Sequence, residues 1–404
     1  MGCRWRRGRV SQQPGRRTTI TFDFDEVIDR RGTSSTKWDK YQGLDVIPLW
    51  LADMDFRSPP AVIEALKQRC EHGVFGYTHP PMELVDTVIV RLYTAYGWTV
   101  ERDWILWLPG LVTGLNVACR AVGEDGDEVL SAVPVYPPFL AAPRNSRRTL
   151  RTVELVLRDG RWTFDFDALA KAISARCRLF LLCSPHNPLG RVFTHEELTT
   201  LAGICERHEV FICSDEIHCD LILDEDKKHI PTATLSREVA DRSITLMAPS
   251  KTFNLPGLGC SFAIIPNRSL RERFRAAMAG IVPDVNAMGF TAALAAYREG
   301  GDWLQAVLAY LRENRDRVAR LVAAMPGLSM THVEATYLAW IDTRDMDIKD
   351  PATFFLDNGV GLSDGTKFGS PGFVRLNFAC PRSRLATALE RMGRAMGRTG
   401  CRGG

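Results

Sequence analysis

Between about residues 103 and 265, short apolar strands alternate with amphipathic helices. The expected strands are EVLSAV, RLFLLCS, VFICS, SITLMA and CSFAII. The expected helices are GLVTGLNVACRAV, FDALAKAISAR and THEELTTLAGICERHE, and a capping box from Thr194 to Glu197 opens the last of them. Strands that are apolar almost throughout are typical of a parallel sheet covered by helices on both faces. The sequence therefore predicts an α/β domain with a largely parallel sheet.

A different pattern follows this region. A long helical stretch, about 289–325, leads to the strands TYLAWID and FVRLNFA and to helices at about 351–358 and 383–396. We expect a second, smaller α+β domain here, with the early segment IPLWLADMDF packed against it. The predicted organisation is a 1–21 extension, a 22–65 N-terminal segment, a 66–289 large domain and a 290–404 small domain.

Composition narrows the class of protein. A chain of 404 residues exceeds one ordinary domain, and 45% apolar with 25% charged residues is usual for a globular protein. No apolar run approaches the roughly 18 residues that span a bilayer. The 11 cysteines are scattered and form no CxxC pair or zinc spacing. We expect a cytoplasmic protein with no membrane partner and no bound metal.

The first 17 residues hold six arginines and no acid, so the rest of the chain is mildly acidic. This arm lacks the apolar centre of a signal peptide. The arm has three alternative interpretations: a nucleic-acid-binding tail, an organelle transit segment, or residues upstream of a true start. We favour a disordered extension without a role and expect no nucleic-acid partner.

Polar residues follow three of the expected strands at the point where each ends. Asn187 comes after RLFLLCS, Asp215 after VFICS, and Ser250 with Lys251 after SITLMAP. Because ligands of open α/β sheets bind outside the carboxyl ends of the strands, these side chains should meet in one pocket. Lys251 is unusual because it lies between two apolar strands, where an ammonium is costly unless it pairs or loses its proton.

These residues jointly suit the chemistry of a pyridine aldehyde. A lysine can form a Schiff base with the aldehyde, a carboxylate can hold the pyridine nitrogen protonated, and an amide can donate to the ring oxygen. A phosphate needs backbone N–H groups at a helix N-terminus. The stretch LPGLVTGLN supplies them, with Gly110 permitting close approach and Leu111 and Val112 offering N–H groups.

In these residues the chain resembles the fold-type I pyridoxal 5′-phosphate enzymes of the class I/II aminotransferase family. It resembles in particular their cystathionine β-lyase-like branch of carbon–sulfur lyases. The resemblance runs from about residue 22 to 396. It is carried by STKWD, PLWLADMDFRSPPAVIEAL, HGVFGYT, PVYPPF, CSPHNPLGRVFT, SDEIH, APSKTFNLPGLG, AAYREGGDWL and FVRLNFACPRS. It implies a large domain with a mostly parallel sheet of seven strands, beside a smaller α+β domain.

The resemblance also implies roles toward the cofactor, pyridoxal 5′-phosphate. Lys251 matches the Schiff-base lysine and Asp215 the partner of the pyridine nitrogen. Asn187 matches the residue that hydrogen-bonds the ring oxygen, and Tyr136 the aromatic residue that stacks on the ring. His218 occupies a place where many aminotransferases have a tyrosine.

Further roles concern the phosphate and the substrate. Ser250 and Tyr77 match phosphate contacts, and Tyr77 also counts as catalytic, reaching from the neighbouring subunit of a homodimer. Arg375 matches the arginine that binds the α-carboxylate of an amino acid, a planar fork well suited to that group. Asn187, Ala52 and Trp50 are also expected to contact the substrate.

The family pattern leaves the reaction open between three alternatives. The first is a β-lyase that cleaves cystathionine or another L-cysteine S-conjugate to a thiol, pyruvate and ammonia. The second is an aminotransferase, and the third is a regulator that retains the fold. We favour the lyase, because a pocket with Trp50, Tyr136 and Phe139 suits a thioether and only Lys367 is an obvious second cation.

Three departures from the family fall on stretches expected near the substrate. Ala335 replaces a glycine, GLSDGTKFG replaces an asparagine-proline-glycine stretch, and Gly259 with Cys260 replace commoner polar residues. They leave the substrate open, while the expected cofactor is unaffected.

Overall fold

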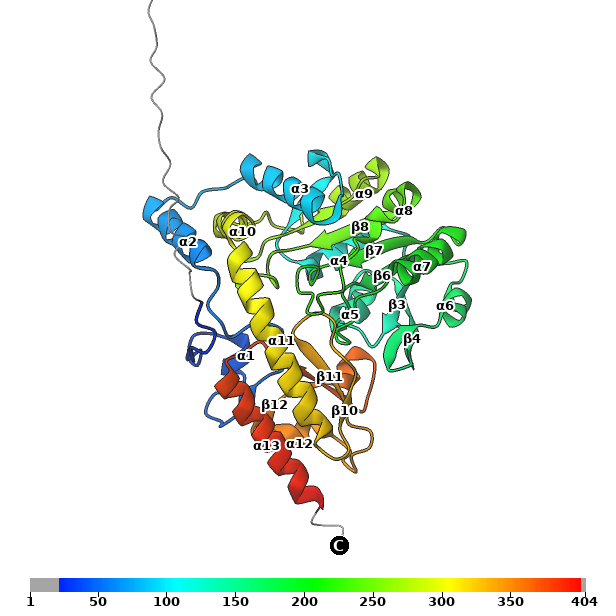
Figure 1. The fold of residues 1–404 in the computed structure, drawn as a ribbon. Coiled ribbons are helices and arrows are strands. Elements are labelled where there is room, and N and C mark those ends of the chain that lie inside the picture. The colour runs from blue at the N-terminus through cyan, green and yellow to red at the C-terminus, as the bar shows by residue number, and fades with distance from the viewer. Residues whose placement is uncertain (1–21, 401–404) are drawn as a thin grey trace, which may run out of the picture.

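The computed structural model describes residues 22–400, with side chains to residue 397, so the Arg-rich arm lies outside the described residues. An eight-stranded sheet forms the larger part of the molecule (Figure 1). In spatial order its strands are β2 (Ile105–Leu108), β9 (Ser261–Ile264), β8 (Ser243–Met247), β7 (Phe211–Asp215), β6 (Cys177–Cys183), β3 (Glu128–Val133), β4 (Thr149–Arg158) and β5 (Arg161–Phe164).

The five central strands of this sheet, from β8 to β4, run parallel. β9 runs antiparallel to both β8 and β2, and β2 is the outermost strand on this side of the sheet. At the other edge β5 pairs antiparallel with β4 and adds an eighth strand to the seven expected. The prediction of a largely parallel α/β sheet is confirmed.

Helices cover both faces of this sheet, because side chains along each strand alternate between two separate cores. In β6, Leu181 packs in the core beneath α4 (Leu111–Ala121), α5 (Pro137–Asn145) and α9 (Arg268–Met278). Its neighbour Leu182 packs in the core beneath α6 (Phe166–Ala172), α7 (His195–Arg207) and α8 (Arg237–Asp241). The expected capping box of α7 is present, with the Thr194 hydroxyl and the Glu197 carboxylate each accepting from the other's backbone N–H. A strand buried on both sides explains the near-continuous apolar runs in the sequence.

The helical stretch expected at 289–325 is two helices rather than one. α10 (Ala287–Glu299) and α11 (Gly301–Ala323) meet at Gly300. A Cβ atom at Gly300 would lie 2.5 Å from the Ala296 carbonyl oxygen and 2.6 Å from the Phe253 ring. The break therefore lies where the chain packs too closely for any side chain.

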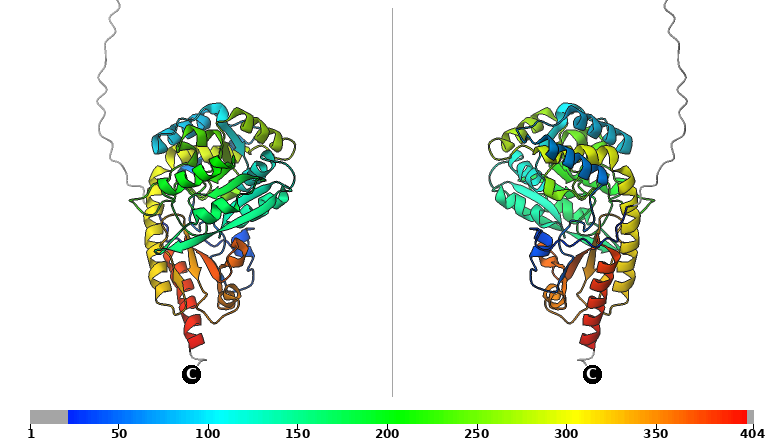
Figure 2. Two further views of the ribbon diagram at one scale, coloured as in Figure 1. Left: turned by 90° about the vertical axis from the view of Figure 1, so that its right-hand side faces the viewer. Right: turned by 90° about the vertical axis from the view of Figure 1, so that its left-hand side faces the viewer.

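The remaining elements form a second, smaller part below the sheet, with α11 running along one side of the molecule (Figure 2). Its four-stranded antiparallel sheet has the order β10 (Ser329–Met330), β11 (Leu338–Asp342), β14 (Phe373–Asn377) and β13 (Ser363–Asp364). Helices α12 (Pro351–Asp357) and α13 (Arg382–Gly400) accompany this sheet.

The N-terminal segment packs with this smaller part, as expected. β1 (Ile47–Pro48) pairs in parallel with β12 (Val360–Gly361), beside the short helix α1 (Thr36–Asp39). Phe24 and Phe56 share a core with Tyr310 of α11, at ring centroid distances of 5.1–5.4 Å. This packing brings the loop at residues 51–56 to the boundary between the two parts. The exact domain limits stay a prediction.

Helices α2 (Pro60–His72) and α3 (Met82–Tyr96) lie on the outside, next to α10. The segment between them, residues 73–81, has no regular structure and is mostly exposed. Among the described residues, no helix is both long and apolar enough to cross a membrane.

Candidate active site

A cavity of about 230 Å³ opens at the carboxyl ends of β6, β7 and β8. Asn187, Asp215, Ser250 and Lys251 line it together, so the expected convergence of the strand ends is confirmed as geometry. Parallel strands bring this about, because their carboxyl ends share one edge of the sheet. The loop that carries Ala52 and strand β14 of the smaller part close the cavity.

Lys251 lies in the turn after β8, with its amine in the cavity. Nζ donates a hydrogen bond to the backbone oxygen of Ala52, 2.5 Å away. Burial lowers the pKa of Lys251 to about 8, although the Asp53 carboxylate opposes this effect. A neutral amine is therefore accessible near physiological pH, which a lysine in water does not offer.

Asp215 is the last residue of β7 and is almost fully buried. Burial raises the pKa of its carboxyl to about 7, because the cavity offers little solvation to a lone charge. One carboxyl oxygen, Oδ1, accepts a hydrogen bond from the backbone N–H of Ile217 at 3.1 Å. A cationic partner in the cavity would hold this group ionised.

The first turn of α4 faces the same cavity. Gly110, Leu111, Val112 and Thr113 all line it, and no side chain caps this helix. The first backbone N–H groups of a helix lack partners within the helix and attract anions. With the hydroxyl of Ser250 nearby, this end of the cavity is suited to a phosphate.

Two ring side chains complete the wall. Tyr136 precedes α5 and lines the cavity, where burial raises the pKa of its phenol. His218 is buried, and burial lowers the pKa of its imidazole to about 3, so the ring is neutral. Its Nδ1 has no hydrogen-bond partner among the described residues, which is unusual for a buried polar atom.

Arg375 enters the site from β14 of the smaller part and is buried. Its Nη1 donates to the side-chain oxygen of Asn187 at 2.9 Å, and its Nη2 donates to the backbone oxygen of Trp50 at 2.8 Å. Nε has no partner among the described residues. Burial lowers the pKa of Arg375 to about 10, which still leaves it charged at neutral pH. A cation so placed is suited to a carboxylate.

A second cavity of about 480 Å³ adjoins the first, and Leu51, Tyr136 and Arg375 line both. Trp50 and Phe368 belong to its wall, and the Arg375 guanidinium lies 4.8 Å from the centre of the Phe368 ring. We call the first cavity, which holds Lys251, the reaction chamber, and the second the larger cavity.

The residues present fit the cofactor expected from the sequence. The cavity holds an amine for the aldehyde, a carboxylate for the ring nitrogen, and an uncapped helix terminus for the phosphate. The Nδ2 group of Asn187 makes no hydrogen bond among the described residues, and His218, whose buried Nδ1 also lacks a partner there, lines the same cavity. These two polar side chains are thus left with hydrogen-bonding capacity that a polar ring bound in the cavity could use.

Two sequence expectations about the substrate pocket are wrong. Phe139 is fully buried in the core beneath α5, because three residues after Tyr136 the helix turns its side chain toward the sheet. Ala335 is also fully buried, and its backbone N–H donates to Gly190 instead of facing either cavity. By contrast, Gly259 and Cys260 line the first cavity, and Asp364 and Lys367 line the second.

Other site residues take unexpected or distant positions. Tyr77 lies fully exposed in the 73–81 segment and lines neither cavity. Trp50 contributes its backbone oxygen to Arg375 and its ring to the second cavity. Sequence reasoning missed Tyr337, whose buried hydroxyl donates to the Ala52 oxygen at 3.0 Å, because the stretch TYLAW read only as a strand. It also missed Lys40, which lines the larger cavity together with Lys367 and Arg375.

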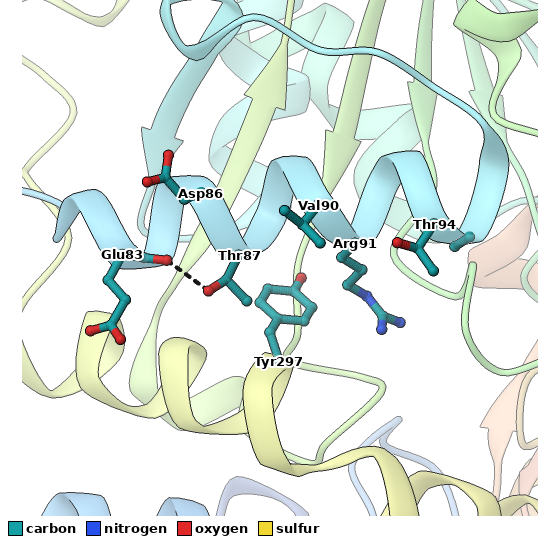
Figure 3. A pocket seen from close by; sticks show the side chains of 8 residues that line it. Glu83, Asp86, Thr87, Val90, Arg91, Thr94 and Tyr297 are labelled. Atoms are coloured by element: carbon teal, nitrogen blue, oxygen red, sulfur yellow. Dashed lines mark hydrogen bonds between the residues drawn. The ribbon is translucent and has the colours of Figure 1, made fainter. Parts of the chain in front are cut away.

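A third hollow, about 660 Å³, lies between α3 and α10, away from the strand ends (Figure 3). Its charged side chains already have partners: Glu83 pairs with Arg298, Asp86 with Arg102, and Arg91 with Asp220. Asp220 in turn accepts from the hydroxyl of Thr252, the neighbour of Lys251, at 3.0 Å. Through Asp220, Arg91 of this hollow is therefore linked to the turn that carries Lys251. The residues that line the hollow include no comparable set of reactive groups.

Comparisons with known proteins agree with this site. The family model described as aminotransferase class I and II matches residues 45–392. Cystathionine beta-lyase PatB of Bacillus subtilis is 40% identical over 93% of this chain and 100% of its own length.

Two solved structures are similar over almost the whole chain. The structure of OvoB superposes with a TM-score of 0.91 and 48% identity, covering 93% of this chain and 99% of the other. Cystalysin from Treponema denticola, whose crystal structure contains pyridoxal 5′-phosphate, gives a TM-score of 0.90 and 34% identity, covering 94% of this chain and 100% of the other.

Proposed function

The chain belongs to the family of class I and II aminotransferases, and from this premise we propose that it is a pyridoxal 5′-phosphate-dependent carbon–sulfur β-lyase. Its substrate is cystathionine or a related L-cysteine S-conjugate. PatB, named a cystathionine β-lyase, and cystalysin, which holds the cofactor, support this function. The observation that carries the proposal is the meeting of Lys251, Asp215, Asn187 and Arg375 in one cavity beside a larger one.

Pyridoxal 5′-phosphate, when bound, supplies an aldehyde that condenses with amines and a pyridine ring that accepts electrons from the substrate. Asp215 would keep a proton on the ring nitrogen, and Asn187 would donate through Nδ2 to the ring oxygen. The first turn of α4 and Ser250 would hold the phosphate. We assign these roles from position and chemistry in the cavity.

Arg375 would bind the α-carboxylate of the substrate and so orient its Cα–H bond toward Lys251. The contacts of Arg375 to Asn187 and Trp50 fix the plane of the guanidinium, which is what bidentate binding requires. An arginine joined to Asn187 places the substrate next to the cofactor ring.

Lys251 would take the α-proton on its neutral amine. The Cβ–S bond then breaks, the electron pair leaves on sulfur, and the departing thiolate takes a proton. The remaining 2-aminoacrylate reacts with water to give pyruvate and ammonia. The Ala52 oxygen, which accepts from both Lys251 and Tyr337, holds the amine in place between proton transfers.

We also infer that the chain acts as a homodimer in which Tyr77 serves the neighbouring site. Tyr77 is fully exposed, and Val74, Phe75 and Met82 around it are large exposed apolar side chains. Tyr93 on α3, the helix that follows, is another large exposed side chain. Such an accumulation of apolar surface is typical of an interface between subunits. The cytoplasmic location and the absence of a nucleic-acid partner stay predictions.

The test of the enzymatic proposal is an assay of purified holoenzyme with L-cystathionine, measuring pyruvate and free thiol. Both products should appear in equal amounts with the native chain and neither with Lys251→Ala. Consumption of the amino acid without thiol release would instead indicate an aminotransferase.

A further inference from the structure

We propose that the larger cavity is the leaving-group subsite and that Lys40 and Lys367 select cysteine conjugates whose departing thiol bears an anionic group such as a carboxylate. This proposal rests on the proposed lyase function and concerns the substrate class of the same site. It assigns a role to side chains that have none in the reaction described above.

The position of the cavity makes it the place for the substrate side chain. It shares Tyr136 and Arg375 with the reaction chamber that holds Lys251. A substrate whose α-carboxylate is bound at Arg375, and whose Cα faces Lys251, has its sulfur substituent near this shared wall. At about 480 Å³, the cavity is twice as large as the chamber and has room for an extended substituent.

Part of the cavity wall is apolar. Tyr41, Trp50, Pro137, Pro138, Leu356 and Phe368 line it. Such a wall favours the methylene groups of a thioether over a polar chain. Any selection for a charged group on the substituent must therefore come from the other residues of the lining.

The carboxylates of the cavity are already engaged. Asp350 accepts hydrogen bonds from the backbone N–H and the hydroxyl of Thr353, at 3.0 and 2.7 Å, where it caps α12. Asp364 accepts from the backbone N–H of Thr366 at 2.9 Å. Each acid thus stabilises a turn of the chain and has less capacity for a ligand cation.

The lysines of the cavity are not engaged in this way. Neither Lys40 nor Lys367 has a carboxylate within 4.0 Å among the described residues. The ammonium of Lys40 lies 4.3 Å from the centre of the Trp50 ring. The backbone oxygen of Trp50 accepts from Arg375 at 2.8 Å. Trp50 therefore contacts both Arg375, assigned to the α-carboxylate, and Lys40, assigned to an anion at the far end of the substrate.

Lys367 also lines this cavity. It precedes Phe368, whose ring faces the Arg375 guanidinium. The uncommitted charges of the cavity are thus positive, and an anion is the ligand that they favour.

Three conjugates of equal chain length test this inference with holoenzyme. They are S-(2-carboxyethyl)-L-cysteine, its amide S-(2-carbamoylethyl)-L-cysteine, and the cationic S-(2-aminoethyl)-L-cysteine. We expect kcat/KM for thiol release to fall in that order, with the acid preferred over the amide by at least about fivefold, the scale of an ion pair near solvent.

Charge-removing variants assign that preference to residues. Lys40→Gln and Lys367→Gln should each lower kcat/KM for the acid by about fivefold and leave the amide unchanged, which also shows that the variants fold. Lys171→Gln, at an exposed position of α6 lining neither cavity, should change neither.

Two results would overturn the proposal in distinguishable ways. If the native enzyme releases thiol from the acid and the amide equally well, or if the lysine variants lose both activities alike, the subsite assignment is wrong while the lyase function stands. Release of thiol from none of the conjugates, nor from cystathionine, would overturn the lyase function and the subsite together.

Discussion

The guanidinium of Arg375 donates through Nη1 to the side-chain oxygen of Asn187, with a separation of 2.9 Å. Arg375 belongs to a strand of the smaller part, and Asn187 follows a strand of the large sheet. This bond joins the residue that we assign to the substrate carboxylate with the residue that we assign to the cofactor ring. The relative position of the two parts thus determines how a substrate meets the cofactor.

Replacing Arg375 with lysine should weaken catalysis strongly. Lysine keeps a charge but cannot bind Asn187, Trp50 and a carboxylate with one planar fork. We expect kcat/KM to fall by the equivalent of about 2–4 kcal/mol. Ser363→Ala removes a 3.4 Å contact to Nη2 and a 2.7 Å hydrogen bond to the Trp50 backbone oxygen but keeps the guanidinium, so as a control it should have a smaller effect. Unchanged kcat/KM in Arg375→Lys would refute the carboxylate role.

Replacing Asp215 with asparagine should reduce both activity and cofactor retention. The amide keeps the size of the side chain but loses the charge that would stabilise a protonated ring nitrogen. Breaking a buried charge pair costs about 3–5 kcal/mol, so kcat/KM should fall at least about a hundredfold. The surface variant Asp167→Asn serves as control. Retention of full activity and cofactor by Asp215→Asn would exclude the assignment.

Stability should depend on pH through Lys251. Its pKa is about 8 in the folded apoprotein and near 10.5 when unfolded, so the unfolded state binds more protons between these values. The stability of the native apoprotein should therefore rise with pH across this window. Lys251→Met should be more stable than the native apoprotein at pH 7 by about 2–3 kcal/mol, after allowing for the lost bond to Ala52.

Urea unfolding of both apoproteins at pH 7 and pH 10 measures this difference. The advantage of the variant should shrink at pH 10, where the native amine is already neutral. An advantage that is equal at the two pH values, or absent at pH 7, would contradict the assigned cost of burying the charge.

If each active site contains residues of both subunits, two different variants that are inactive or weakened alone should restore activity when they form a mixed dimer. In a mixed dimer of Tyr77→Phe and Lys251→Ala, one site combines an intact Lys251 with the partner subunit's Tyr77. Such dimers should exceed the activity of both parent dimers. Mixed dimers no more active than the better parent would argue against a contribution across the interface.

Most of the candidate site was predictable because it depends on local order along the chain. Asn187, Asp215 and Lys251 each follow a recognisable buried strand, and parallel strands bring such positions to one edge. The sequence could not reveal the helix break at Gly300, since that depends on close packing against Phe253. It also failed for Phe139, because the direction of a side chain in a short helix depends on where that helix lies on the sheet.

The remaining parts of the site depend on contacts between distant segments. Lys40 lies over the Trp50 ring in the lining of the second cavity, and Tyr337 shares the Ala52 oxygen with Lys251. No spacing in the sequence reports such pairs. The larger cavity has two lysines without a carboxylate partner among the described residues, where the sequence indicated one, and this supports the proposed preference for an anionic substituent.

The measurement that most directly tests the lyase function is single-turnover mixing of the holoenzyme with cystathionine, following pyruvate, free thiol and pyridoxamine phosphate together. The pathways for elimination and transamination diverge after the same α-proton removal, and 1.4 kcal/mol between their barriers changes the partition tenfold. We predict one thiol and one pyruvate per active site, with little pyridoxamine phosphate. Stoichiometric pyridoxamine phosphate without thiol release would contradict the lyase and identify an aminotransferase.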